Sequence, residues 1–365
     1  MKHLYLLLTI LSLQLSSCQN KKTMKNDIFQ WQETISCPTG YAVDVYEGGL
    51  ISKDNFTSLC LGVYTGKDDW GKGSSGMSYG EKTIPNHLRL VWASYIEHKF
   101  YEIDTPIDYD KMVKLFNETY YLSTDNPEKP EPHKQNYNSI VVGLAPGGVV
   151  VIWVAGIGRQ VEVGRYEGKE ITFSKEEIEA LPSGHRKNMH NIAYQEKILS
   201  HHSKFVNVIN EIKNKPIPYG LWDTYRKKYN WQVKFLFSHN EKIERVTYNL
   251  YNGEEEKLFG EAITEKYSYI PKELKCNFKK NKAIPNLISF RFIVDNAEYG
   301  CSIHLDEKEI MNAFERVLGN DPKAEVDIEI YVNTDRTDAT VALKSKDKKV
   351  ALFDCNIKIG KRRDL

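Results

Sequence analysis

The chain has 365 residues, of which 50 are lysine or arginine and 49 are aspartate or glutamate. Charges that cancel so closely exclude a general electrostatic attraction to nucleic acid or to anionic lipid. A chain of this length is long enough for two domains, each with its own hydrophobic core.

The first 17 residues have the pattern of a bacterial lipoprotein signal peptide. Lys2 gives a positive start, and residues 4–15 form an apolar stretch that is too short to anchor the chain as a membrane span. Leu-Ser-Ser-Cys at positions 15–18 resembles a lipobox, which implies that Cys18 carries the lipid in the mature chain. The alternative is an ordinary signal peptide in which the cysteine falls there by chance.

Residues 18–28 are polar and rich in lysine, and we expect them to form a tether between the lipid and the folded part. Gln19 differs from the aspartate that resembles an inner-membrane retention signal, and the tether lacks the acidic run that resembles a surface-export signal. We therefore expect a lipoprotein of the outer membrane on its periplasmic face, which contacts the membrane through the anchor alone.

Five cysteines remain after Cys18, and an oxidising compartment permits disulfides. The odd count leaves at least one thiol unpaired unless it pairs between molecules. Cys37 and Cys60 are the nearest local pair, and the alternative is that both are small residues of the core.

Residues 29–173 read as an α+β domain. Strands are predicted at 41–46, 60–64 and 88–101, with a glycine- and serine-rich loop at 66–80. Asp108 or Asp110 is the predicted N-cap of a helix that ends near Tyr120. Two hairpins follow, and the clearer one pairs residues 139–144 with 149–154 around the turn Ala-Pro-Gly-Gly.

Residues 174–228 are predicted to be a helical linker. Ser174 and Glu177 have the spacing of a capping box, and a longer helix is expected from residue 187 to 213, ended by the prolines at 216 and 218. The aromatic and basic stretch 216–232 is expected to contain a short helix wedged between the lobes. Asp223 lies three residues before Arg226, a spacing that allows a surface ion pair.

Residues 229–365 read as a second α+β domain. Strands are predicted at 232–238, 244–251, 274–278, 288–296 and 299–304, followed by a helix that Asp306 caps and Gly319 ends. Three further strands complete the chain, at 325–332, 339–345 and 349–359.

The two halves resemble each other at a shift of about 200 residues. Trp31 lies between two glutamines and Trp231 between asparagine and glutamine, and Ile-Pro-Asn occurs at 84–86 and again at 284–286. The order of the predicted elements around these matches also agrees. We therefore predict an internal duplication into two lobes, each a mostly antiparallel sheet with one packed helix; chance matching is the alternative.

Four segments together resemble a family of bacterial lipoproteins catalogued as domain of unknown function 2931. They are the tryptophan before the first strand, IPNHLRLVWAS at 84–94, GLAPGG at 143–148 and PYGLWDTYRKKYNW at 218–231. The resemblance covers residues 29–232 and supplies no catalytic residues. Some members resemble products of genes beside secreted antibacterial effectors, which implies an immunity role.

No pattern in the chain assigns a catalytic, cofactor or metal site. The stretch 66–73 nearly spells a phosphate-binding loop, but Gly73 stands where a Ser or Thr would hold magnesium. Histidines 185, 190, 201 and 202 lack the further ligands that zinc needs, and we expect them to be solvated helix residues. No nucleophile elbow occurs.

We expect a non-enzymatic module that binds another envelope protein, through the groove between the lobes or the loop 66–80. An immunity protein against a periplasmic toxin is the sharpest form of this hypothesis. The alternatives are a binder of glycan or another envelope ligand through exposed aromatic rings, and a hydrolase with an unrecognised site. The candidate contact residues are Trp70, Tyr79, Tyr219, Trp222, Tyr225 and Arg226.

Overall fold

The computed structural model describes residues 27–66, 69–123, 131–201 and 206–364. The predicted signal peptide and the lipidation site Cys18 lie outside these residues. The described chain is mostly strand with fewer helices, so the predicted α+β class is confirmed. Among the helices in these ranges, none combines the length and the apolar character that crossing a bilayer requires.

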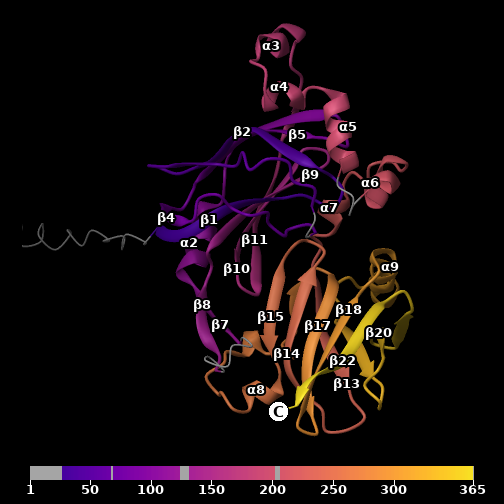
Figure 1. The fold of residues 1–365 in the computed structure, drawn as a ribbon. Helices are drawn as coiled ribbons and strands as arrows, with labels where there is room; N and C mark the ends of the chain where they lie inside the picture. Colours follow the sequence, from indigo (N-terminus) through magenta and orange to yellow (C-terminus); the bar gives the residue numbers. More distant parts are fainter. Residues whose placement is uncertain (1–26, 67–68, 124–130, 202–205, 365) are drawn as a thin grey trace, which may run out of the picture.

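The N-terminal half, residues 28–171, contributes five strands to each of two sheets and has a separate hairpin of β7 and β8 (Figure 1). Its strands are β1 (Ile28–Ser36), β2 (Val43–Ile51), β3 (Phe56–Ser58), β4 (Gly80–Thr83), β5 (His87–Ser94), β6 (Lys99–Pro106), β7 (Thr119–Leu122), β8 (His133–Asn136), β9 (Ser139–Ala145), β10 (Val149–Gly156), β11 (Arg159–Glu167) and β12 (Lys169–Ile171). One sheet has the order β4-β1-β9-β10-β11, and the other has the order β12-β6-β5-β2-β3. Only β1 and β9 are parallel neighbours among these ten strands.

The C-terminal half, residues 229–364, also contributes five strands to each of two sheets. They are β13 (Tyr229–Leu236), β14 (Lys242–Leu250), β15 (Glu255–Phe259), β16 (Lys280–Lys282), β17 (Pro285–Val294), β18 (Ala297–His304), β19 (Val326–Val332), β20 (Ala339–Ser345), β21 (Lys348–Leu352) and β22 (Asn356–Asp364). One sheet has the order β16-β13-β19-β20-β21, with β13 parallel to β19. The other strands run in the order β22-β18-β17-β14-β15.

Strand pairing joins the two halves. β11 pairs with β15 at Arg159–Glu256 and Gln160–Glu255, so strands of both halves form one ten-stranded sheet. The expectation of one sheet per lobe is therefore wrong, because each half has two sheets and the halves share one of them. A helix is about 10 Å wide and covers about two strands, so one helix leaves most of a five-stranded apolar face to be covered by a second sheet.

Each half encloses its own core between its two sheets and one helix. Helix α2 (Tyr109–Asn117) buries Met112, Val113 and Phe116 in the N-terminal core, and α9 (Glu307–Leu318) does the same in the C-terminal core. Asp108 caps α2 by accepting from the Lys111 backbone N–H at 3.0 Å, and Asp306 caps α9 in the same way. Both capping predictions are confirmed, with Asp108 and not Asp110 as the first cap.

The strand sequences show which sheet faces are covered. β10 reads VVVIWVAG and is buried along almost its whole length, because both of its faces are covered. β17 reads PNLISFRFIV and alternates between buried and partly exposed residues, because one of its faces lies at the surface. The two strands therefore differ in whether one or both of their faces are covered.

Each half contains a lysine over a buried tryptophan. The Lys82 Nζ lies 3.9 Å from the Trp31 ring centre and forms an ion pair of 3.1 Å with buried Glu33. The Lys282 Nζ lies 3.8 Å from the Trp231 ring centre in the same way. Val233, however, stands two residues after Trp231, where Glu33 stands after Trp31. Lys282 is therefore a buried cation whose Nζ has no hydrogen-bond partner within the described chain.

The linker helices cover the outer face of the sheet that contains β2, β5 and β6 (Figure 1). They are α4 (His185–Met189), α5 (Ile192–His201) and α6 (Val206–Lys213); α3 (Lys175–Ala180) precedes them and buries no residue, and α7 (Leu221–Thr224) follows near the junction of the halves. The capping box of Ser174 and Glu177 is confirmed. The single helix expected from 187 to 213 is wrong, since α5 begins anew where the Asn191 side chain accepts from the Tyr194 N–H at 3.3 Å.

Replacing each of the two lysines by methionine is expected to change the stability of the fold in opposite directions. Lys82→Met should lower the free energy of unfolding by about 3 kcal/mol, because it leaves Glu33 buried without its cation. Lys282→Met should raise it by about 2 kcal/mol near pH 7, because the cost of burying the charge exceeds the lost ring contacts. Denaturant titrations of both variants check this, and equal effects of the two substitutions would contradict it.

The pH dependence gives a second measurement on Lys282. Burial lowers its pKa to about 8, although Glu256 favours the charged form. Between about pH 8 and the ordinary lysine pKa near 10.5, the unfolded chain binds the proton that the folded chain has lost, so this residue makes stability rise with pH. That rise should be absent in Lys282→Met.

Candidate binding cleft between the halves

A cleft of about 690 Å³ lies where the two halves and the linker meet. The N-terminal wall is formed by the segment after β1, the loop around Trp70, the end of α6 and α7. The C-terminal wall is formed by the turn after β14 and the start of α9. The volume is in the range of ligand-binding clefts. Aromatic side chains in its lining are Tyr41, Trp70, Trp222, Tyr225 and Tyr251.

The wall nearest the junction is organised by Trp153 on β10. Its ring is fully buried and meets the Trp70 ring edge to face, with ring centres 4.9 Å apart. The Trp153 indole N–H donates to the Asn252 carbonyl of the C-terminal half at 3.1 Å. One side chain of the N-terminal half thus fixes both the loop around Trp70 and the turn after β14.

Two glycines allow the backbones of the halves to approach closely. A Cβ at Gly71 would lie 2.5 Å from the Gly253 Cα, and both residues have a φ of +84°. The Gln160 side-chain amide donates to the carbonyls of Gly71 at 2.7 Å and Gly253 at 2.5 Å. Any larger residue at either glycine would force the halves apart.

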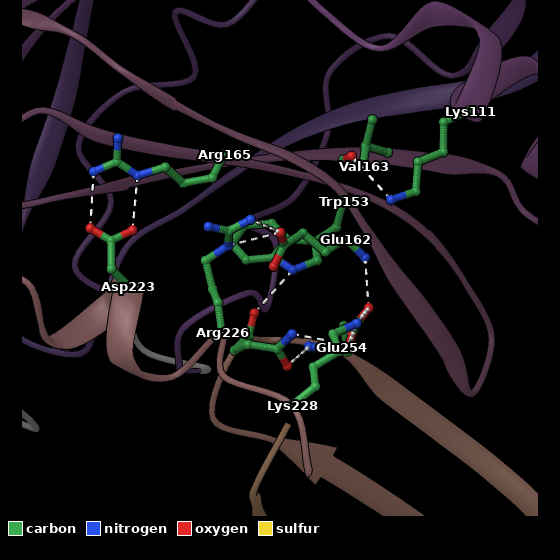
Figure 2. A network of polar contacts seen from close by, with 10 residues as sticks. Lys111, Trp153, Glu162, Val163, Arg165, Asp223, Arg226, Lys228 and Glu254 are labelled. Atoms are coloured by element: carbon green, nitrogen blue, oxygen red, sulfur yellow. Dashed lines mark hydrogen bonds and ion pairs between the residues drawn. The ribbon is translucent and has the colours of Figure 1, made fainter. Parts of the chain in front are cut away.

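Ion pairs tie the end of the linker to both halves (Figure 2). Arg165 on β11 binds the Asp223 carboxylate with two N–H groups, at 2.9 and 3.0 Å. Arg226 pairs with Glu162 of β11 at 2.7 Å, and Lys228 pairs with Glu254 of the C-terminal half at 3.1 Å. The predicted pair of Asp223 with Arg226 is wrong, because each has a closer partner on β11.

The predicted contact residues do not form one site. Trp70, Trp222 and Tyr225 line the cleft, and each is at most 8% exposed, so they form its floor. Tyr219 lies apart in a hollow beside Gly147 and Lys169, where its hydroxyl donates to Glu97 at 3.0 Å. Tyr79 is exposed, and its hydroxyl donates to Gln30 at 3.3 Å.

The predicted short helix around Trp222 is confirmed in its place but not in its length. α7 ends at Thr224, and Tyr229 belongs to β13, where its ring packs on Phe314 with centres 5.2 Å apart. Tyr225 and Tyr229 therefore do not share a helical face. Arg226 lies after the helix and is held in its ion pair with Glu162.

Sequence reasoning missed the C-terminal side of the cleft. Glu307 and Lys308 begin α9, and Tyr251 follows β14, where its hydroxyl donates to the Leu305 carbonyl at 2.8 Å. No local pattern marks these residues, since they reach the cleft only through the packing of the halves. The predicted groove between two lobes was the sole signal that pointed to them.

The cleft combines an aromatic floor with charged groups around it. Burial, and then the nearby Glu307 carboxylate, raise the pKa of Tyr225 well above its ordinary value, so its hydroxyl stays a neutral donor. Charged groups of both signs stand around the aromatic floor, among them Asp69, Glu211, Lys215 and Lys308. Within the described residues, no group of histidine, cysteine and carboxylate side chains has the arrangement of a metal site.

The cysteines depart from expectation, and the histidines do so only in part. Cys37 is buried, its thiol donates to the Tyr64 carbonyl at 3.3 Å, and Cys60 is an exposed free thiol, so the two are not bonded to each other. His185 pairs with the buried Asp44 at 2.8 Å. His185 is nevertheless exposed, as the sequence predicts, whereas His190 is enclosed by aromatic rings and its burial lowers its pKa, so His190 is not the solvated residue expected.

The burial of Trp222 in the floor of the cleft predicts that its removal destabilises the fold. Trp222→Ala should lower the free energy of unfolding by about 3–5 kcal/mol, because it empties a buried site that packs against Tyr41, with ring centres 5.4 Å apart. Tyr219→Ala is the control, since its ring is 58% exposed and should change stability by about 1 kcal/mol or less. Thermal unfolding checks both. A Trp222→Ala protein with the wild-type melting temperature would contradict the structural role.

Comparison with known proteins gives one match. The family described as a protein of unknown function, DUF2931, matches residues 17–220, more than half of the chain. No curated protein and no solved structure matches. The matched segment ends just before α7, so it contains the N-terminal half and most of the linker. The chain belongs to the DUF2931 family.

Proposed function

We propose that the chain is a lipid-anchored, non-enzymatic module that holds a segment of a partner protein in the cleft between its halves. The cleft carries this proposal. Its floor offers aromatic surface, which favours recognition of apolar groups, and its rim offers charges of both signs, which favours a polypeptide over a small apolar ligand. Anchoring through Cys18 at the periplasmic face of the outer membrane belongs to the same proposal.

We also propose that the two halves arose by duplication. The strand orders β4-β1-β9-β10-β11 and β16-β13-β19-β20-β21 correspond position by position, and so do β12-β6-β5-β2-β3 and β22-β18-β17-β14-β15. The Trp31 indole N–H donates to the carbonyl of Lys82 on β4, and the Trp231 indole N–H donates to the carbonyl of Ala283, which directly follows β16. Agreement in strand order and in the direction of the parallel pair supports duplication more strongly than short sequence matches do.

An immunity protein is the sharpest form of the binding proposal, with a toxin that acts in the periplasm as the partner. It follows from the family resemblance and not from the cleft itself. The second candidate is a glycan or another envelope ligand, which the aromatic lining of the cleft favours because sugar rings stack on such side chains.

Charge reversal on the rim tests the cleft. The unlipidated mature chain is used to isolate a partner from an envelope extract, and the purified partner is then titrated against Lys215→Glu/Lys308→Glu. Both lysines are exposed and line the cleft, so we expect affinity to fall about tenfold or more with the fold unchanged. Lys272→Glu/Lys323→Glu, two exposed lysines outside the cleft lining, is the matched control and should bind as wild type.

The same variants separate the alternatives. Equal affinity of the rim variant and its control would contradict binding in the cleft. Absence of a protein partner, together with a glycan-array signal that the rim variant loses, would favour the glycan candidate.

Anchoring has a direct test. Cells that express the chain are labelled with a radioactive or alkyne-bearing fatty acid, and Cys18→Ala should lose the label and leave the membrane fraction. Cys60→Ala, which removes an exposed thiol of the folded part, is the control and should keep the label. Label retained in Cys18→Ala would contradict the anchor.

A further inference from the structure

The edge of β13 that faces away from β19 is paired only along its first residues. β16 pairs with β13 over residues 229–231, whereas β19 pairs with it from Trp231 to Leu236. Among the residues that the structure describes, no strand continues the pairing on the β16 side beyond Trp231. Residues 232–236 therefore form an open sheet edge in the C-terminal half, and an open edge is a template for a further strand.

The corresponding edge of the N-terminal half is covered by a segment of the same chain. β1 holds the place in its sheet that β13 holds in its own. The segment that leads into β4 lies along β1 beyond Trp31. The Ser74 N–H donates to the Ile35 carbonyl at 2.8 Å, and a Cβ at Gly76 would lie 2.5 Å from the Glu33 carbonyl oxygen. A single polypeptide segment, antiparallel to β1, thus covers this edge.

Backbone groups of alternate residues on β13 point to the open edge. On β1, the Gln32 N–H donates to the residue before β9, while the Ile35 carbonyl accepts from the segment on the other side. β13 pairs with β19 from Gln232 onward in the register in which β1 pairs with β9. The N–H and C=O groups of Val233 and Phe235 therefore face the open edge, since successive residues of a strand direct theirs to opposite sides.

A groove of about 500 Å³ follows this edge. Its lining includes the six consecutive residues 232–237. Because side chains of a strand alternate between two faces, an unbroken run in the lining indicates a groove along the edge and not on one face. The other lining residues come from the start of β14, the residues before it and the segment after β15: His239, Glu241, Ile243, Glu261, Cys276 and Asn277. The edge therefore lies in a recess with a second wall.

The core-facing side of the recess is apolar. Phe235 and Phe237 are half-buried and pack on Phe290 and Phe292 of β17, with ring centres 4.7 and 5.2 Å apart. Buried Ile243 lines the same recess. Apolar side chains of an added strand would remove the exposed parts of both rings from water, which favours their binding.

The charged residues around the edge are engaged elsewhere. A lysine on an edge strand often prevents pairing, but the Lys234 Nζ forms an ion pair of 2.7 Å with Asp327 of β19, on the opposite side of β13 from the recess. On the second wall, Glu241 pairs with Arg336 at 3.4 Å, and a Glu261 oxygen accepts from the Ile243 N–H at 2.6 Å. The recess therefore favours an apolar segment over a charged one.

We propose that this edge binds an extended segment of a partner protein as an added antiparallel strand with apolar side chains at alternate positions. Backbone hydrogen bonds to Val233 and Phe235 hold the segment, and its apolar side chains cover the rings of Phe235 and Phe237. A second copy of this chain fits less well, because its edge strand would bring the rest of its sheet against the second wall. No described residue lines both this recess and the cleft between the halves.

The test uses a fluorescein-labelled peptide of alternating valine and threonine as the probe, with polarisation measured on the unlipidated mature chain. Valine side chains placed over the two phenylalanine rings direct the valine N–H groups to β13 and the threonine N–H groups to solvent. A peptide N-methylated at its valines should bind about tenfold more weakly or worse than the parent peptide. The matched peptide, N-methylated at its threonines, should bind like the parent. The protein is identical in all titrations, so folding cannot cause the difference.

Hydrogen exchange locates the bound peptide. In the protein alone, the amides of Val233 and Phe235 should exchange faster than those of Gln232 and Lys234, which face β19. The parent peptide should slow exchange at Val233 and Phe235 and leave the other two amides unchanged.

Four results would overturn the proposal. They are absence of binding by the parent peptide, equal affinity of the two methylated peptides, unchanged exchange at Val233 and Phe235, and a dimer of the protein alone that the peptide dissociates in analytical ultracentrifugation. The dimer would assign the edge to a second copy of the chain. Lys215→Glu/Lys308→Glu should keep peptide binding, so failure of the cleft and failure of this edge are distinguishable.

Discussion

The contact of Trp153 with the turn after β14 determines how the two halves sit together. The ring has no exposed surface, and it meets Trp70 on one side and the Gly253 backbone on the other. Since Gly71 and Gly253 approach to a distance that excludes any side chain, the junction tolerates little relative displacement. The floor of the cleft is therefore held in place by close packing at the junction.

The two halves have similar strand orders but differ in what covers them. In the N-terminal half, the linker helices cover one outer face, and the loop around Trp70 together with α7 covers another. In the C-terminal half, the outer faces carry charged residues such as Arg291 on β17 and Glu329 on β19. The cores differ as well, since buried Glu33 stands beside one lysine–tryptophan pair and Val233 beside the other.

Much of the local structure could be predicted, because its signals lie within a few residues of one another. The turn at 145–148 and the caps at Asp108, Ser174 and Asp306 are of this kind. The ion pair of Asp223 with Arg226 was wrong for the same reason, since spacing along the chain says nothing about Arg165 and Glu162, which lie about 60 residues earlier. The pairing of β11 with β15 has no local signature at all, and with it the shape of the cleft could not be predicted.

The way the chain enters the fold also has a mechanical consequence. β1 begins at Ile28, pairs with β4 along its first residues and then with β9 from Gln32 to Ser36. A force applied to the preceding residues would pull β1 along its own axis, so it would load these hydrogen bonds together in shear and could not open them one by one. A strand held in this way resists extraction.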